Sequence, residues 1–437
     1  MSTFRDRVEA ALSLEDAKTV FLDAFTEASA AGTLPAFRSA CASCVLDPPT
    51  RFCLPYAFAY EARALMHDWT LWHPPQPGER TVPRPELLAG LDACLARPEA
   101  INHRDNYYWS IIAGLRHTIA GDAVTGFQHL ADAARHGDFY RVVKDDLGCG
   151  AAFARSYPTE AELDRAGASA RFARDADWVT EFSAPQQLVI STAFDRIYGQ
   201  AFAEPWIRSV VPLAAAGVGL HFHVMFRNAA DSALLQGFAE AARAHGVDLA
   251  ISVETQVAHA NAYFASARFL KAAHLLRHFD APMLFADADS FMPSPEAFRD
   301  RHLPGLIAES RVMGLIVDGP WNGYLPWRRF SATWMFSPNR PDAAAFLTRV
   351  ADAIEYFWDE RGCNWWIDQM ALEIGRCSVT AAMAAPPSFG DVFAEFPGML
   401  DSGEQYKLAR IAALPQIRSR MEGGMPYWQA LDQAGRE

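Results

Sequence analysis

The sequence lacks several features that would assign a protein to a class at once. Its 437 residues contain no run of about 18 uncharged apolar residues, so no membrane-spanning helix is expected. The first residues, 1–9, have no apolar core of the kind that a secretory signal needs, and the expected location is cytoplasmic. The formal net charge of -13 argues against general nucleic-acid binding, which requires a basic surface.

Two common kinds of site are also missing. No Gly-rich phosphate loop of the Walker or dinucleotide type is present, which weighs against kinases and dehydrogenases. The seven cysteines show no disulfide-framework spacing, and the CxxC formed by Cys41 and Cys44, with Cys53 nearby, has no second CxxC to complete a zinc site. We interpret these cysteines as reduced structural thiols in a helical region, with metal or redox chemistry as the alternative.

What the sequence does contain is a globular mixture that is long enough for more than one domain. Hydrophobic residues make up 51% and charged residues 21%, and at about 150 residues per domain this length suggests two or three domains. Helical spacing over 10–31 and 86–96 indicates helices in the first part. We predict an all-α helical domain over 1–175, followed by an α/β domain over 176–437.

The clearest helical unit lies between Tyr107 and His136. Its first helix carries one apolar stripe, formed by Trp109, Ile112, Leu115 and Ile119. A break at Gly121 separates this helix from a second one. The pair is similar to a tetratricopeptide unit, with Gly114 and Gly121 near the expected small positions, and a generic helical bundle is the alternative.

From Gln187 onward, short β-rich runs alternate with helical segments. The predicted strands are 188–192, 220–226, 247–253 and 283–286, and the predicted helices are 207–214, 232–245 and 268–278. This alternation predicts a parallel α/β sheet with right-handed crossovers. Ligands of such sheets bind beyond the carboxyl ends of the strands, so a functional site is expected directly after the apolar runs.

Two carboxylates, Asp287 and Asp289, follow the last of these strands. Side chains two residues apart at a strand end point the same way, and such close carboxylates repel each other unless a cation lies between them. Mg²⁺ and Mn²⁺ prefer oxygen ligands and often complete their coordination with phosphate and water. The pair therefore predicts a site for Mn²⁺ or Mg²⁺ that stabilises a leaving diphosphate. A helix cap or a solvated loop is the alternative.

The segment Tyr263–Leu276, the strand after it and Asp287-Ala288-Asp289 together resemble nucleotide-diphospho-sugar transferases of the GT-A fold. The pattern is closest to the retaining, galactosyltransferase-like branch and covers roughly Gln187 to Arg410. The resemblance implies a Rossmann-like, mainly parallel sheet. It also implies that Arg268 and Ala288 lie against the sugar donor and that the two aspartates bind the metal.

Two downstream segments carry the same resemblance. Arg329–Phe336 resembles the family strand that follows the donor site, and Trp365–Met370 resembles its Asp-Gln segment. The resemblance implies that Asp368 lies against the reacting sugar carbon, where it stabilises positive charge or attacks, and that Gln369 orients the sugar or the acceptor. Taken alone, an Asp-Gln at a helix start also serves as a cap. Trp365 and Trp366 line an acceptor pocket or belong to the core.

The first strand and the C-terminal region supply further candidates. Ser191–Tyr198 is similar to the family's opening segment, which implies that Asp195 and Tyr198 contact the nucleoside base. Lys407 is a candidate for a donor phosphate, with a solvated surface lysine as the alternative. His221 and His223 share one face of a strand and are interpreted as core or interface histidines.

The sequence departs from the family pattern at two places. Ser331 stands where the family usually has Asn, and no His follows His302 to act as a third metal ligand. Asp391, Asp401 or water could replace that ligand.

Three functions are compatible with these residues. The first is a glycosyltransferase that uses a UDP- or GDP-linked sugar, with the helical domain presenting or recognising the acceptor. Helical repeat surfaces commonly bind polypeptides, so a protein acceptor is one expectation, beside a glycan or a small molecule. The second is a degenerate transferase domain that serves as an interaction scaffold, and the third is a metal-dependent nucleotidyltransferase.

Overall fold

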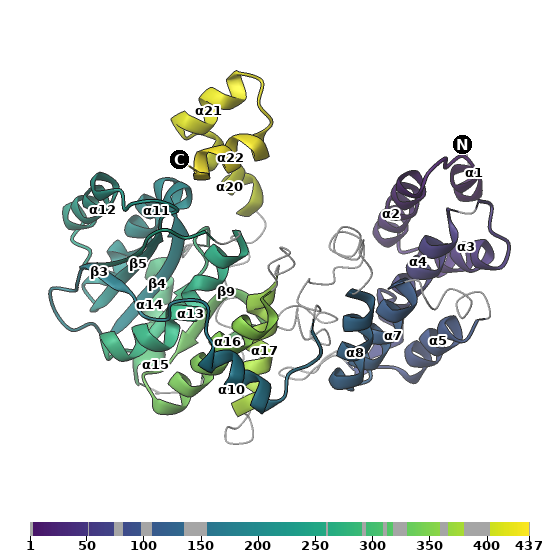
Figure 1. Cartoon of the computed structure of the whole chain (residues 1–437), viewed down its shortest axis with the longest axis horizontal. Coiled ribbons are helices and arrows are strands. Elements are labelled where there is room, and N and C mark those ends of the chain that lie inside the picture. The colour runs from purple at the N-terminus through teal and green to yellow at the C-terminus, as the bar shows by residue number, and fades with distance from the viewer. Residues whose placement is uncertain are drawn as a thin grey trace. The chain divides into compact units, whose positions relative to one another are not determined.

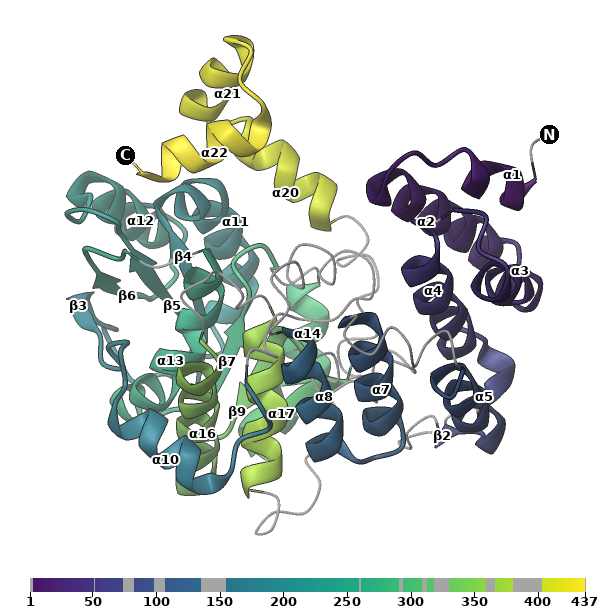
Figure 2. The same cartoon turned by 45° about the vertical axis from the view of Figure 1, so that its right-hand side comes forward.

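A computed structural model describes residues 3–50, 52–73, 82–97, 107–134, 155–258, 261–290, 294–308, 313–317, 330–358, 366–379 and 403–436. Figures 1 and 2 show it from two directions. The chain divides into two compact units. The first consists of Met1–Thr159, Asp318–Arg329 and Phe357–Trp366, and the second of Glu160–Val317, Phe330–Tyr356 and Ile367–Glu437. In the described part of the chain, no helix combines the length and hydrophobicity that spanning a bilayer requires.

The first unit is built from helices, as predicted. They are α1 (Phe4–Glu9), α2 (Leu14–Ala30), α3 (Leu34–Leu46), α4 (Leu54–Met66), α5 (Pro85–Leu95), α7 (Tyr107–Ile119) and α8 (Ala123–Ala134). A 3-10 turn, η1 (Trp69–Leu71), and the short pair β1 (Trp72–His73) and β2 (Val82–Pro83) lie between α4 and α5. Side-chain caps start the first two helices, because Thr3 accepts a hydrogen bond from the Asp6 N–H and Ser13 accepts one from the Asp16 N–H.

The helices α7 and α8 form the predicted pair, and glycine sets their separation. A Cβ atom on Gly114 would lie 2.6 Å from Leu130 Cγ and 2.9 Å from the carbonyl oxygen of Gly126. The two backbones therefore approach more closely than any larger residue allows. Gly121, with φ +90°, lies in the turn between the helices, a conformation that glycine adopts at little cost.

The second unit contains a seven-stranded sheet of order β3-β6-β5-β4-β7-β9-β8. Its strands are β3 (Asp177–Thr180), β4 (Leu188–Asp195), β5 (Val218–Met225), β6 (Leu249–Glu254), β7 (Met283–Ala286), β8 (Gly314–Val317) and β9 (Phe330–Ser337). The four inner neighbours β6, β5, β4 and β7 are parallel, whereas β3, β9 and β8 pair antiparallel. The predicted α/β fold class, with a mainly parallel sheet after an all-α region, is confirmed.

Helices connect and cover these strands (Figure 1). They are α10 (Glu160–Ala168), α11 (Arg196–Ala214), α12 (Ser232–Ala244), α13 (Asn261–Phe279), α14 (Pro295–Arg301), α15 (Leu303–Ala308), α16 (Pro341–Phe357), α17 (Ile367–Val379), α20 (Gly403–Ala412), α21 (Pro415–Glu422) and α22 (Tyr427–Arg436). One continuous apolar core joins the sheet to side chains of α11, α12, α14 and the three C-terminal helices. Burial of this surface is the main stabilising term of the unit.

The order of the strands locates the site. From β4 the chain builds outward through β5 to β6, and α13 then returns it to β7 on the other side of β4. The order therefore reverses between β4 and β7. In open α/β sheets the crevice beyond the carboxyl ends at such a reversal is where ligands bind.

Candidate functional site

Two acidic residues lie at the reversal point of the sheet. Asp195 is the last residue of β4, and Asp287 directly follows β7, which pairs with β4 in parallel. Asp195 is also the N-cap of α11, where its side chain accepts a hydrogen bond from the Tyr198 N–H at 2.8 Å. Both predicted site residues are therefore at the carboxyl edge, where the sequence pattern placed them.

The backbone of the acidic motif is held from both sides. The Asp287 N–H donates to the carbonyl of Thr333 on β9 at 2.8 Å, and the Ser290 N–H donates back to the carbonyl of Asp287 at 3.1 Å. Ala288 is buried, and its carbonyl accepts a hydrogen bond from Trp206 Nε1 at 2.8 Å. Ala288 therefore anchors the turn from which the two aspartates project.

Arg268 bridges two of the predicted site carboxylates. Its guanidinium, 1% exposed, places Nη1 3.3 Å from Asp287 Oδ1 and Nη2 3.4 Å from Asp368 Oδ2. Nη2 also donates to the carbonyl of Ala332 at 2.8 Å, and Nη1 donates to the carbonyl of Ala265. A planar guanidinium suits such a shared arrangement, because its fixed fork serves several oxygens at once.

The electrostatic environment of these carboxylates is set by burial and by Arg268. Although 39% of the Asp287 side chain is exposed, loss of hydration around the carboxyl raises its pKa, Asp289 and Asp368 add to this rise, and Arg268 opposes it. Burial likewise raises the pKa of Asp368, and Arg268 again opposes the rise. Asp287 and its acidic neighbours are thus close enough to repel each other, and a nearby positive charge favours their ionised forms.

Lys407 neutralises the second aspartate of the motif. Its Nζ lies 2.7 Å from Asp289 Oδ2 and 5.3 Å from the centre of the Tyr198 ring. Burial opposes the charged form of Lys407, but Asp289 and Tyr198 together outweigh burial and raise the lysine pKa. The helix that carries it, α20, is fixed on α11, since Arg410 donates to the carbonyl of Ala201 at 2.8 Å and Ile411 is fully buried. Lys407 therefore lies beside the acidic motif, and its role in the site stays a prediction.

The two aspartates keep oxygens that fit a divalent cation. Asp287 uses Oδ1 for Arg268 and for the Ala288 N–H, and among the described residues its Oδ2 has no partner. Asp289 uses Oδ2 for Lys407, whereas its Oδ1 has only a 3.5 Å contact with the Ser290 hydroxyl. Within the described ranges no three acidic, His or Cys side chains are grouped for one ion. A cation here would therefore take its remaining ligands from phosphate and water, as Mg²⁺ and Mn²⁺ commonly do.

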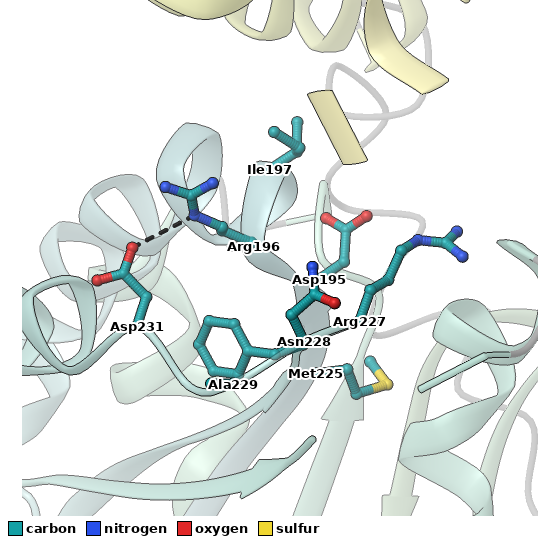
Figure 3. Close-up of a pocket in the computed structure, with 9 residues that line it drawn as sticks. Asp195, Arg196, Ile197, Met225, Arg227, Asn228, Ala229 and Asp231 are labelled. Atoms are coloured by element: carbon teal, nitrogen blue, oxygen red, sulfur yellow. Dashed lines mark hydrogen bonds and ion pairs between the residues drawn. The ribbon is translucent and has the colours of Figure 1, made fainter. Parts of the chain in front are cut away.

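A pocket of about 200 Å³ opens beside Asp195 (Figure 3). The residues that line it come from the start of α11 and from the segment that follows β5: Asp195, Arg196, Ile197, Met225, Phe226, Arg227, Asn228, Ala229 and Asp231. Arg196 forms an ion pair with Asp231 at 3.3 Å. Burial raises the pKa of Asp195, and the Tyr198 N–H and the charge of Arg227 oppose this rise. The pocket thus combines an acid, an amide and a guanidinium that can recognise a polar ligand.

Gln369 adds an unused acceptor next to Asp368. Its backbone N–H donates to Asp368 Oδ1 at 2.9 Å, a contact between neighbouring residues within the first turn of α17 rather than an N-cap hydrogen bond. The side-chain Oε1 is shielded from solvent and has no hydrogen-bond partner among the described residues. A buried oxygen without a donor is costly, so this amide is suited to a ligand that brings one.

Comparisons with known proteins find a distant structural similarity. No family model matches the chain, and no curated protein matches it. A solved structure of the mannosyltransferase PcManGT from Pyrobaculum calidifontis, in complex with GDP-Man and Mn2+, is similar at 14% identity. The match covers 71% of this chain and 94% of that chain, with a TM-score of 0.27. A likeness this distant carries no inference about function, which must come from the residues themselves.

Most of the sequence-predicted residues come together. Contacts link Asp287, Arg268 and Asp368 in one group and Asp289, Lys407 and Tyr198 in another, and the repulsion between Asp287 and Asp289 joins the groups. The functional roles assigned to these residues stay predictions.

The remaining candidates fall into two sets. Ser331 lies on β9, and its hydroxyl lies 2.7 Å from the Thr333 hydroxyl. His221 and His223 are fully buried, as interpreted from the sequence. Trp365, Asp391 and Asp401 lie outside the described residues.

Sequence reasoning missed four polar residues of the pocket, which are Arg196, Arg227, Asn228 and Asp231. Arg227 and Asn228 follow β5 and line the cavity beside Asp195. Their position could have predicted a role in binding, because they directly follow an apolar strand, and ligands of parallel sheets bind beyond the strand ends.

Proposed function

We propose that the second unit is a glycosyltransferase that moves a sugar from a nucleotide-diphosphate-sugar donor to an acceptor. The observation that carries the proposal is a series of polar side chains along the carboxyl edge of the sheet. It begins at Asp195 in the pocket and continues through Tyr198, Lys407, Asp289, Asp287 and Arg268 to Asp368.

Each part of this series suits one part of the donor. The pocket beside Asp195 suits the nucleoside, for which Asp195 offers an acid, and Tyr198, outside the pocket lining and near Lys407, offers an aromatic ring. Lys407 suits the diphosphate, and Asp287 and Asp289 suit a Mn²⁺ or Mg²⁺ ion bound to it. When bound, that ion would stabilise negative charge on the leaving nucleoside diphosphate. Asp368 and Gln369 then face the sugar.

The residues around the sugar have chemistry that the transfer needs. Arg268 favours the ionised form of Asp368, and a carboxylate stabilises the positive charge that develops at a sugar carbon as its leaving group departs. The free Oε1 of Gln369 can accept a hydrogen bond from a sugar or acceptor hydroxyl. Lys407 can donate to the departing phosphate while α20 stays fixed.

A catalytically degenerate scaffold is the second candidate, and one observation favours it. Both motif aspartates are already paired with cationic side chains, Asp287 with Arg268 and Asp289 with Lys407. In a scaffold these pairs would be permanent. In an enzyme, Lys407 would leave Asp289 and bind a phosphate of the donor. In either case we expect the helical unit to bind the partner, and a protein acceptor is one candidate.

Donor hydrolysis without an acceptor tests the proposal. The protein is incubated with UDP- and GDP-linked sugars and Mn²⁺, and the release of nucleoside diphosphate and free sugar is measured. We expect slow release from one donor class, and its loss in Asp289→Asn. Asp300→Asn is the matched control, because Asp300 is an exposed acid whose ion pair among the described residues is with the neighbouring Arg299. Release of sugar phosphate instead would indicate attack at phosphorus, and no release from any donor would favour the scaffold.

A further inference from the structure

A single carboxylate, that of Glu254, holds the helix α13 at two points. The Tyr263 hydroxyl lies 2.8 Å from both Oε1 and Oε2 of Glu254, and Lys271 Nζ lies 2.9 Å from Oε2. Lys271 also donates to the carbonyl of Ala173. Both side chains from α13 are buried, with relative exposures of 0% and 1%. The charge of Lys271 is therefore removed from water and balanced within the protein by Glu254.

These two points flank Arg268 on the helix. Tyr263 precedes Arg268 by five residues and Lys271 follows it by three, so about one turn of α13 separates each anchor from the arginine. A helix fixed on both sides of a residue cannot slide or rotate there without breaking one of the anchors. Glu254 therefore restrains the position of the Arg268 backbone, together with the packing of α13 on the sheet.

Glu254 is itself immobilised at the end of β6. Its carbonyl accepts a hydrogen bond from the Phe226 N–H at 2.8 Å, and His223 Nε2 lies 3.5 Å from its Oε2. A chain of buried hydrogen bonds continues behind it across three strands. It runs from His223 to Ser252 at 2.9 Å, from Ser252 to His221 at 2.9 Å and from His221 to Ser191 at 2.8 Å. These hydrogen bonds join β4, β5 and β6 behind Glu254 and favour one arrangement of the buried polar side chains.

We propose that Glu254 is a positioning residue that sets how Arg268 is shared between Asp287 and Asp368. The two distances from the guanidinium, 3.3 Å and 3.4 Å, are nearly equal and both exceed an optimal charged hydrogen bond. A small shift of α13 brings the guanidinium to one carboxylate and removes it from the other. This inference rests on the proposed transferase function, because it assigns Glu254 to the same site without any contact between Glu254 and the donor.

The test shortens the anchor without removing its charge. Glu254→Asp keeps the ion pair with Lys271 but draws the carboxylate back by one methylene, so that α13 must shift or release an anchor. We expect kcat for donor hydrolysis to fall at least tenfold with a smaller change in KM. We also expect the affinity for Mn²⁺ with GDP or UDP, whichever the wild type binds, to fall in a calorimetric titration. Tyr263→Phe removes one anchor and leaves the charges in place, and should give a smaller loss of the same kind.

The control is Leu276→Val, a change in a buried apolar residue of the same helix. It should lower the melting temperature without changing kcat or nucleotide affinity well below that temperature. Equal kcat and affinity in Glu254→Asp and Leu276→Val would overturn the positioning role. If Glu254→Asp does not fold, Tyr263→Phe serves as the test of the positioning role. Unchanged kcat and nucleotide affinity in Tyr263→Phe would overturn that role as well. If the wild type binds neither nucleotide with Mn²⁺, the proposed function fails, and the inference fails with it.

Discussion

Arg268 and Asp368 lie 3.4 Å apart, Nη2 to Oδ2, although one hundred residues separate them in the chain. The contact joins α13, which precedes the acidic motif, to the first turn of α17, which follows the antiparallel strands. The same guanidinium reaches Asp287 at 3.3 Å. One buried cation therefore connects a proposed metal ligand with the proposed catalytic carboxylate.

Removing this cation should damage both stability and activity. Arg268→Met leaves Asp287 and Asp368 without their shared positive charge, and breaking a buried pair typically costs about 3–5 kcal/mol. We expect the free energy of unfolding, measured in urea, to fall by the lower end of this range, because Asp287 is partly exposed. Donor hydrolysis should be lost as well. Arg208→Met is the control, since the exposed pair of Arg208 with Glu204 contributes little. Equal losses of unfolding free energy in the two variants would show that the ion pairs of Arg268 do not stabilise the site.

Lys407 should affect metal binding in opposite directions with and without nucleotide. In Lys407→Met, Asp289 loses its resident cation, so Mn²⁺ alone should bind more tightly, by about three- to tenfold. Mn²⁺ with nucleotide should bind about tenfold more weakly, because a charged hydrogen bond to phosphate is lost. Free Mn²⁺ measured by electron paramagnetic resonance gives both affinities. A change in the same direction under both conditions contradicts the proposed exchange of Lys407 between Asp289 and the donor.

Glu254 should make folding stability depend on acid pH. Burial alone raises the pKa of Glu254, but the contacts with His223, Lys271 and Tyr263 outweigh it and lower the pKa from 4.5 to about 2. A lowered pKa means that the stabilisation is complete above pH 4.5 and disappears as the pH falls toward 2. It amounts to something on the order of 3 kcal/mol. The difference in unfolding free energy between wild type and Glu254→Gln should therefore shrink between pH 5 and pH 2. A constant difference would mean that the folded state does not favour ionised Glu254.

The close pair of helices α7 and α8 should not tolerate a larger residue at their contact. Gly114→Ala forces a methyl group to within 2.6 Å of Leu130 and 2.9 Å of a backbone oxygen, so the first unit should lose about 1–3 kcal/mol. Gly237→Ala is the matched control in α12, where an added Cβ meets nothing within 4 Å. That change should stabilise its helix by up to about 1 kcal/mol. Thermal unfolding of both variants measures these changes in stability. An unchanged melting temperature in Gly114→Ala would show that the two helices can move apart to accommodate the methyl group.

How far the sequence predicted the structure depended on the range of the interactions. The helix pair α7–α8 and the strands β4 to β7 follow from local periodicity and turn residues, and all were predicted. The order of the strands and the antiparallel strands at the edges depend on long-range packing, which periodicity does not encode.

The same distinction holds for the site. Asp287 and Asp289 were found because a strand end positions them. The assignment of Asp368 needed a family resemblance, and Lys407 was a candidate beside the alternative of a surface lysine, since no local rule brings residues 368 and 407 to the acidic motif. The pairing of Arg268 with two acids and the anchoring of α13 by Glu254 depend on contacts across the sheet. No pattern in the sequence predicted these two sets of contacts.

Thermal unfolding with added ligands tests the central claim most directly. The wild type and Asp289→Asn are heated with Mn²⁺ alone, with GDP or UDP alone, and with both together. A ligand that binds only the folded state raises the melting temperature, so the wild type should gain stability when metal and one nucleotide are both present, and the variant should not. No gain in the wild type, or an equal gain in Asp289→Asn, would contradict a metal-assisted nucleotide-sugar site at this edge of the sheet.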